Sequence, residues 1–239
     1  VAPAIRSIDP HTSPKFFLFV HIYEPHRPYA PPARFTASNP YDGEVEYADE
    51  IVGTLLAHLR ATRLYDRAAI VLLSDHGEGL GDHGEDEHGI FLYRATLHVP
   101  LVIKMPGARG GARVQAPVQH LDVGPTLAAL AGAAQPAGLA GRSLLPVLTG
   151  AGALPEASIY AESLTPRYHF GWSELYALTD GRYRLIRAPR DELYDLAQDP
   201  REQRSIADER PQAHAAMRRT LDAMVAGVAV DAPSAVSSE

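Results

Sequence analysis

The sequence predicts an α/β fold with a mainly parallel sheet flanked by helices, followed by a small C-terminal antiparallel α+β subdomain. Apolar runs of strand length at 16–22, 68–74 and 99–104 are continuous rather than alternating, which is typical of strands covered on both faces. A helical pattern lies between the first two runs. Strand, helix and strand in this order indicate a crossover connection, and therefore parallel strands.

The predicted helix spans Glu44 to Arg63. Its apolar residues recur at spacings of three and four, which places them on one face: Val45, Ala48, Val52, Leu55, Leu56 and Leu59. A shorter helix is predicted in "HLDVGPTLAALAG", with Asp122 as its N-cap and Gly132 near its end. These elements place the α/β core at residues 15–150.

The pattern changes in the last third of the chain. Four short runs with turn signals between them predict strands of an antiparallel sheet: "ASIYAES", "ELYALTD", "RYRLIRA" and "ELYDL". A last helix is predicted at about 210–226. We therefore expect a C-terminal subdomain at 151–228 and a disordered polar tail at 229–239. Residues 1–14 show no pattern of an element and are predicted to be a linker.

Composition argues against several functional classes. The 239 residues carry a formal net charge of −7 without a basic run, which argues against nucleic acid or an anionic membrane as the main partner. The chain contains no cysteine, and therefore no thiolate metal ligand and no cysteine nucleophile. No apolar stretch approaches the roughly 20 residues of a membrane span.

A glycine-rich acidic loop, residues 75–88, follows the second apolar run in "IVLLSDHGEGLGDHGEDEHG". Ligands of open α/β sheets bind beyond the carboxyl ends of the strands, so Asp75 and His76 would stand at the crevice. Their oxygen and nitrogen donors suit a divalent metal, which would offset the charge of the loop. A solvated acidic loop is the alternative. Glu85 and Asp86 are expected on a flexible part of the loop.

Two histidines follow the first apolar run. His21, at the end of the run, suits a satisfied core histidine. His26 lies between Pro25 and Pro28 in a stiffened loop, where a catalytic side chain is held at a low cost in entropy. We therefore expect His26 to point into the same crevice as the acidic loop.

Taken in order, seven segments resemble the sulfatase family of the alkaline-phosphatase superfamily. They are "FFLFVHIYEPHRPYAPP", "YADEIVGTLLAHL", "IVLLSDHGEGLGDHG", "HGIFLYRATLHVPLVIKMPG", "LDVGPTLAALAG", "GRSLLPVLTG" and "DELYDLAQDP". The resemblance extends from about Lys15 to Leu221. It implies an alkaline-phosphatase-like sheet and metal-assisted hydrolysis of a sulfate ester of a small molecule or saccharide.

The resemblance also implies roles for individual residues. Asp75 and His76 match two ligands of the family's single divalent cation, for which the family points to Ca²⁺, while the nitrogen of His76 leaves Mn²⁺, Mg²⁺ and Zn²⁺ open. His26 matches the histidine that contacts the sulfate and helps to protonate the leaving oxygen. His88 stands where many sulfatases have a lysine that holds the sulfate, and its imidazole would do this only when protonated.

Two motifs of the family have no counterpart in these residues. One is the aspartate segment that completes the metal shell, and the other is the "[CS]-x-P-x-R" segment whose Cys or Ser becomes the formylglycine nucleophile. Ser13 stands beside a proline but without the arginine, so we interpret it as accidental. We therefore expect the nucleophile to lie in a missing N-terminal part of the same enzyme, and the isolated chain to be inactive.

Two other functions stay open. The first is a phosphodiesterase or phosphonate monoester hydrolase of the same superfamily, which is favoured because His76 stands where sulfatases more usually have Asn. The second is an inactive fragment or pseudoenzyme that serves as a binding module. The sequence does not identify the substrate. Tyr168, His169 and Trp172, in a predicted loop at 165–172, are candidates for stacking on a sugar or aromatic ring.

Overall fold

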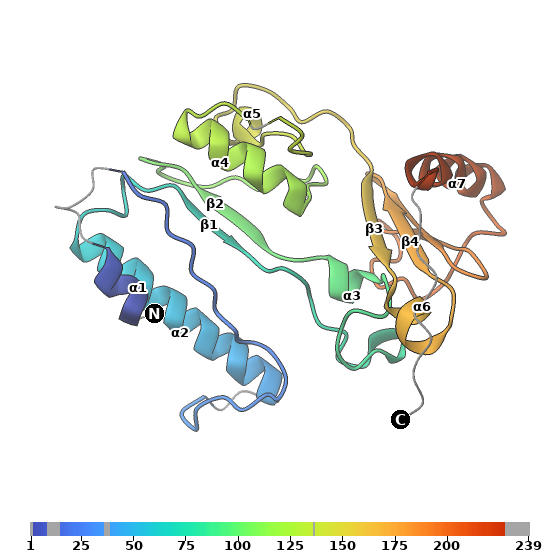
Figure 1. Ribbon diagram of the computed structural model, residues 1–239, viewed down its shortest axis with the longest axis horizontal. Helices are drawn as coiled ribbons and strands as arrows, with labels where there is room; N and C mark the ends of the chain where they lie inside the picture. The colour runs from blue at the N-terminus through green and yellow to red at the C-terminus, as the bar shows by residue number, and fades with distance from the viewer. Residues whose placement is uncertain (1, 9–14, 36–38, 136, 228–239) are drawn as a thin grey trace. The chain divides into compact units, whose positions relative to one another are not determined.

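The computed structural model describes residues 2–8, 15–35, 39–135 and 137–227 (Figure 1). The chain divides into two compact units. The first unit contains the described residues up to Val71 and the segment Val102–Gly111. The second unit contains Leu72–Leu101 and the described residues from Ala112 onward. The predicted domain limits at residues 15, 150 and 228 stay predictions, and the predicted tail at 229–239 lies outside the described residues.

The first unit contains two helices. α1 (Ala2–Ser7) lies where the sequence shows no pattern of an element, so that expectation is wrong for these residues. α2 (Pro40–Ala61) confirms the predicted amphipathic helix, although it begins earlier. Asn39 caps α2, because its side chain accepts a hydrogen bond from the backbone N of Asp42 at 2.9 Å. Pro40 suits the first turn, where its missing N–H leaves no carbonyl unpaired.

No strand forms at 16–22, although the sequence predicts one there. None of the described residues pairs with this segment in a sheet. Its aromatic side chains are largely exposed, and the exposed fraction of Phe17 is 76%. A strand is stable only where a neighbour satisfies its backbone N–H and C=O groups, so an apolar run does not form one by itself. The predicted strand is therefore wrong in this structure.

β1 (Ile70–Leu73) and β2 (Leu101–Lys104) pair in a two-stranded sheet, which confirms the other two predicted core strands. The division between the two units falls within both strands. In the first unit, Nζ of Lys104 donates to the carbonyl of Ala68 at 3.0 Å, so the end of β2 is tied to the turn before β1. A mainly parallel sheet is not confirmed, because it depends on the strand at 16–22.

The second unit contains a four-stranded antiparallel sheet in the order β3-β4-β5-β6 (Figure 1). Its strands confirm the four predicted runs: β3 (Ile159–Ser163), β4 (Leu175–Thr179), β5 (Tyr183–Arg187) and β6 (Glu192–Asp195). Asp180 closes the β4–β5 turn, because its Oδ1 accepts hydrogen bonds from the backbone N of Arg182 at 2.7 Å and of Tyr183 at 2.6 Å.

Side chains that alternate along this sheet pack into two apolar clusters. The first cluster joins the sheet to the predicted last helix, α7 (Pro211–Val225), and contains Tyr176, Leu178, Leu185, Leu193, Met217 and Leu221. The second cluster contains Leu92, Leu175, Ala177, Ile186 and Tyr194. Leu92 follows the acidic loop closely in sequence. The sheet therefore anchors the chain just beyond the loop.

The remaining helices of the second unit are short. They are α3 (Arg94–Leu97), α4 (Val123–Ala131), α5 (Leu145–Leu148) and α6 (Thr165–Phe170). α4 confirms the predicted helix, and Gly132 ends it with φ 68°. α6 replaces the loop predicted at 165–172. In the described part of the chain, no helix is both long and apolar enough to cross a membrane.

Candidate active site

The pair Asp75 and His76 follows the end of β1 after one intervening residue, as the sequence predicts. The side chain of Asp75 is 81% exposed, and that of His76 is partly exposed. Oδ1 of Asp75 accepts a hydrogen bond from the backbone N of His76 at 3.0 Å and lies 3.8 Å from Nε2 of the same residue. The carboxylate and the imidazole therefore lie close together at the strand end.

The tautomer of His76 follows from its hydrogen bond. Nδ1 lies 2.8 Å from the carbonyl oxygen of Gly77, which can only accept, so Nδ1 carries the proton. In the neutral ring Nε2 then carries a lone pair. A metal-binding histidine usually has this form, with its other ring nitrogen bonded to a carbonyl or carboxylate. The pair thus presents one oxygen donor and one nitrogen donor.

His88 packs against His76. The ring centroids lie 3.7 Å apart, with 25° between the planes. Nδ1 of His88 lies 3.0 Å from Oε1 of Glu78, whose side chain is almost fully buried. Because a carboxylate can only accept, Nδ1 donates, and Glu78 is placed to balance the charge of a protonated ring. The acidic loop therefore brings two of the predicted histidines together.

The loop folds back closely on its neighbours. The backbone N of Gly77 donates to the carbonyl of Thr96 at 2.8 Å. A Cβ at Gly77 would lie 2.1 Å from the carbonyl oxygen of Ala95, and a Cβ at Gly79 would lie 2.2 Å from that of Glu85. Any other residue at either position would collide with backbone. Close approach of backbone therefore requires these two glycines, and neither has a positive φ.

Glu85 is a structural residue of the loop. Its side chain is buried and accepts hydrogen bonds from the backbone N of Ile90 at 2.7 Å and of Phe91 at 3.3 Å. The expectation that Glu85 lies on a flexible part of the loop is therefore wrong, because a buried carboxylate is held by its donors. Asp86 is exposed. The charge pattern alone did not distinguish the two.

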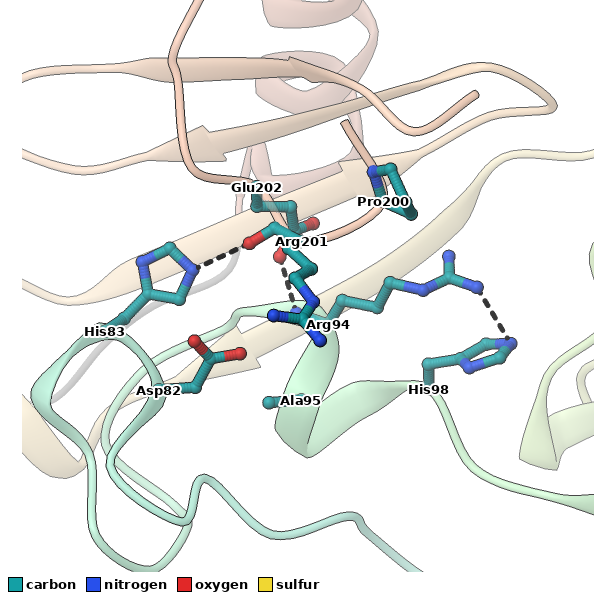
Figure 2. Close-up of a pocket in the computed structure, with 8 residues that line it drawn as sticks. All are labelled: Asp82, His83, Arg94, Ala95, His98, Pro200, Arg201 and Glu202. Atoms are coloured by element: carbon teal, nitrogen blue, oxygen red, sulfur yellow. Dashed lines mark hydrogen bonds between the residues drawn. The ribbon is translucent and has the colours of Figure 1, made fainter. Parts of the chain in front are cut away.

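Figure 2 shows a cavity of about 240 Å³ that adjoins the loop, lined by Asp82, His83, Arg94, Ala95, His98, Pro200, Arg201 and Glu202. Nε2 of His83 donates to the carbonyl of Arg201 at 3.1 Å. On the other side of the cavity, a guanidinium nitrogen of Arg94 lies 3.2 Å from Nε2 of His98. Burial, together with the nearby charges of Arg94 and Arg184, lowers the pKa of His98. The neutral ring therefore accepts at Nε2.

A buried ion pair ties this region to the C-terminal sheet. Oε2 of Glu202 accepts from the backbone N of Arg94 at 2.6 Å, and Oε1 lies 3.3 Å from Nη1 of Arg184. Burial raises the pKa of Glu202 and lowers that of Arg184, and each charge offsets part of the shift of the other. The sequence pattern did not predict this pair. The only sign of it in the sequence was Arg184, a charged residue within the predicted strand "RYRLIRA".

His120 is a further residue that the sequence analysis missed. Its Nε2 lies 2.8 Å from the carbonyl oxygen of Ser74, so it donates to the residue immediately before Asp75. Oγ of Ser74 in turn donates to the carbonyl of His76 at 2.6 Å. These bonds hold the chain at the end of β1, next to Asp75 and His76. A histidine so close to the predicted N-cap Asp122 was the only signal of this role.

His26 belongs to the first unit. Its Nδ1 lies 2.7 Å from the carbonyl oxygen of Arg27 and 3.0 Å from Oη of Tyr23, on whose ring it stacks. Its backbone N donates to Oε2 of the buried Glu44, from α2, at 3.1 Å. The loop is therefore held by a helix as well as by its prolines. His21 is exposed, so the expectation of a core histidine there is wrong.

The structure brings Asp75, His76 and His88 together in the second unit. His26 lies in the first unit, so its presence in the same crevice stays a prediction. The described residues contain no group of three or more His, Cys, Asp or Glu that could hold a metal ion. Asp75 and His76 therefore offer two protein donors, and the metal site stays a prediction.

Two family models match the chain: Sulfatase over residues 1–133, and N-sulphoglucosamine sulphohydrolase, C-terminal, over residues 81–228. The chain belongs to the sulfatase family. The resemblance seen in the seven segments is thereby confirmed, and the two matches together include residues of both compact units.

Two curated relatives have similar levels of identity. A choline-sulfatase of Rhizobium meliloti (strain 1021) is 33% identical over 175 residues, which cover 70% of this chain and 32% of the relative. An N-acetylglucosamine-6-O-sulfatase of Bacteroides thetaiotaomicron is 33% identical over 175 residues, which cover 70% of this chain and 31% of the relative. The chain thus spans about a third of the length of these relatives.

A solved structure of a different activity is also similar. The phosphonate monoester hydrolase SpPMH from Silicibacter pomeroyi matches with a TM-score of 0.65 and 31% sequence identity, over 78% of this chain and 40% of that chain. The likeness supports the expected alkaline-phosphatase-like fold, but it does not confirm a mainly parallel sheet. It also shows that the alternative function class occurs among the structural relatives of this chain.

Proposed function

We propose that this chain forms part of the active site of a hydrolase that cleaves sulfate esters of small molecules or saccharides. The observation that carries the proposal is the geometry after β1, where the exposed carboxylate of Asp75 lies 3.8 Å from the lone-pair nitrogen of His76. Relatives named as a choline-sulfatase and an N-acetylglucosamine-6-O-sulfatase support this substrate class.

The donor atoms suit one divalent cation. We propose Ca²⁺ on family grounds. Mn²⁺ and Zn²⁺ are alternatives that the nitrogen of His76 favours, and Mg²⁺ is a further alternative. When bound, the cation would stabilise the charge that develops on the ester and activate the nucleophile. Two protein donors leave most of the coordination sphere to water, so binding to this chain should be weak.

The other predicted residues have separate proposed roles. His88, whose charge Glu78 can balance at 3.0 Å from Nδ1, would hold sulfate oxygens through its protonated ring. His26 would protonate the leaving oxygen from Nε2, because Nδ1 is bonded to the carbonyl of Arg27 at 2.7 Å. The formylglycine nucleophile would come from outside these residues, which contain no "[CS]-x-P-x-R" motif.

Metal binding can be tested on the chain itself by titrating Mn²⁺ and following the imidazole proton resonances. The signals of His76 and His88 should broaden first, because paramagnetic relaxation falls steeply with distance from the ion. His169, exposed on α6, is the matched control and should broaden later. In Asp75→Asn the difference between His76 and His169 should disappear. Equal broadening of the two in the unmodified chain would contradict the proposed site and favour an inactive binding module.

The second candidate is a phosphodiesterase or phosphonate monoester hydrolase. It is favoured by the nitrogen donor of His76 and by the likeness to SpPMH at 31% identity. An aryl sulfate and an aryl phosphonate, assayed in parallel with Ca²⁺, Mg²⁺ or Mn²⁺, distinguish the two ester classes once a nucleophile-bearing segment is joined to the chain.

The same assay tests whether the chain contains its own nucleophile. The purified 239-residue chain is expected to hydrolyse neither ester, because it lacks the family's nucleophile motif. Turnover by the unmodified chain that is lost in Asp75→Ala would place the nucleophile within it and contradict the proposed division of the site.

A further inference from the structure

A second cavity, of about 260 Å³, lies in the second unit. Its walls come from the 91–93 segment, from residues near the end of α6 and from β4, β5 and the start of β6. None of Asp75, His76 and His88 lines it, and most of the surface that it presents is apolar. The cavity is therefore separate from the proposed metal donors.

Three of the eleven residues that line this cavity are aromatic. Phe91, Tyr93 and Trp172 all line it. Phe91 and Tyr93 meet edge to face, with ring centroids 5.9 Å apart. Trp172, the only tryptophan of the chain, is 58% exposed and packs on Phe170 at 4.9 Å between ring centroids. A large aromatic ring that stays exposed beside an apolar cavity, as Trp172 does, is typical of a surface that receives a ligand.

One carboxylate, that of Glu192, lines the cavity among these rings. Its Oε2 accepts hydrogen bonds from Oη of Tyr93 at 2.9 Å and of Tyr194 at 2.7 Å. Burial, together with the nearby Glu192, raises the pKa of both tyrosines, so their hydroxyls stay protonated and keep donating. The two tyrosines thus hold the carboxylate in place.

Within the described residues, the charge of Glu192 is not balanced by an ion pair. In the described part of the chain, no Lys, Arg or His forms an ion pair with this carboxylate. Hydrogen bonds from two neutral hydroxyls stabilise the charge but do not cancel it. The cavity therefore combines apolar aromatic walls with an uncompensated negative charge.

We propose that this cavity binds an organic cation, namely an ammonium group with apolar substituents. The faces of aromatic rings attract cations, and an alkylated ammonium loses little hydration when it enters apolar walls. A metal ion would be disfavoured, because one carboxylate cannot replace its water. An anion would be repelled by Glu192. The proposal does not depend on sulfate ester hydrolysis, since it uses none of the proposed catalytic residues.

Trp172 provides the readout, because no other tryptophan contributes to the fluorescence of the chain. The probe is choline, and its neutral counterpart is 3,3-dimethyl-1-butanol, in which carbon replaces the ammonium nitrogen. Titrations are compared at one ionic strength, set with sodium chloride. Choline should bind more tightly than the neutral alcohol, on the order of tenfold. Equal affinity for the two molecules, or no response to choline, would overturn the proposal without bearing on the Mn²⁺ titration.

Two variants test the role of the carboxylate. Glu192→Gln should remove the preference for choline while the neutral alcohol binds as before. Glu162→Gln is the matched control, because Glu162 also accepts from a tyrosine, Tyr160 at 2.5 Å, but does not line the cavity. It should keep the full preference. Circular dichroism shows whether Glu192→Gln is folded. A folded Glu192→Gln that still prefers choline to the neutral alcohol would contradict the proposal. If this variant does not fold, the comparison of choline with the neutral alcohol in the unmodified chain still tests the proposal.

Discussion

The two strands of the β1–β2 sheet are more apolar than the four strands of the β3–β6 sheet, but their side chains are less covered. In the β3–β6 sheet Leu185 and Leu193 are 0% exposed, whereas in the β1–β2 sheet Val102 is 58% exposed. The β3–β6 sheet packs on α7 and on Leu92, and a tight turn joins its central strands, β4 and β5. Apolar composition therefore indicates which segments favour a strand, but coverage depends on the neighbours that the chain supplies.

The largest effect should come from the buried ion pair between Arg184, on β5, and Glu202. Arg184→Leu leaves the charge of Glu202 buried without its partner, which should cost about 3–5 kcal/mol of unfolding free energy. Urea unfolding followed by Trp172 fluorescence measures this cost. Arg190→Leu is the matched control, because its pair with Asp208, at 3.6 Å, is exposed and should contribute at most about 1 kcal/mol. Similar costs for both variants would mean that burial does not distinguish the two pairs.

The comparison between the sheets can be tested directly by truncating one side chain in each. Leu185→Ala should lower the unfolding free energy by about 2–5 kcal/mol, because it leaves a cavity in a closed apolar cluster. Val102→Ala should cost less than about 1 kcal/mol, because an exposed side chain loses little contact with its neighbours. Urea unfolding followed by circular dichroism measures both. A cost for Val102→Ala equal to that for Leu185→Ala would show that β2 is covered in solution.

Within the acidic loop, changing a buried carboxylate should likewise cost more unfolding free energy than changing the exposed carboxylate next to it. Glu85→Gln weakens the bonds to the backbone N of Ile90 and Phe91 and should cost about 1–3 kcal/mol. Asp86→Asn should stay within about 0.5 kcal/mol, because Asp86 is exposed. Hydrogen exchange of the amides of Ile90 and Phe91 reports the local change. Unchanged protection of these two amides in Glu85→Gln would mean that Glu85 does not hold this part of the loop.

The smallest expected effect is a pH dependence at the end of β6. The hydrogen bond from Arg182, at 2.9 Å, lowers the pKa of Asp195 below its ordinary value. The stability contributed by this carboxylate is therefore fully present above the unfolded pKa of about 4 and is lost as the pH falls through the folded pKa. Asp195→Asn should flatten this loss in urea unfolding series below pH 4. Identical pH profiles for the two proteins would exclude the contribution of Asp195.

The site shows how far sequence reasoning reaches. Asp75 and His76 could be placed at a strand end, because the apolar run before them has strand length and ligands gather at the carboxyl ends of such strands. Their neighbours could not be placed. Sequence does not indicate which of Glu85 and Asp86 receives backbone donors, nor that the ring of His88 stacks on His76, because both depend on how the loop folds back.

What the sequence by itself determined are the elements whose pattern is local. The alternation in β4 and β5 and the helical spacing in α2 specify which side chains share a face, and the periods of helix and strand are set by the backbone. Only the tertiary structure decided that 16–22 pairs with none of the described strands, that Arg184 meets Glu202, and that Glu192 and Trp172 line the same cavity. These outcomes depend on which distant segments come together and satisfy each other's polar groups, and no local period encodes that.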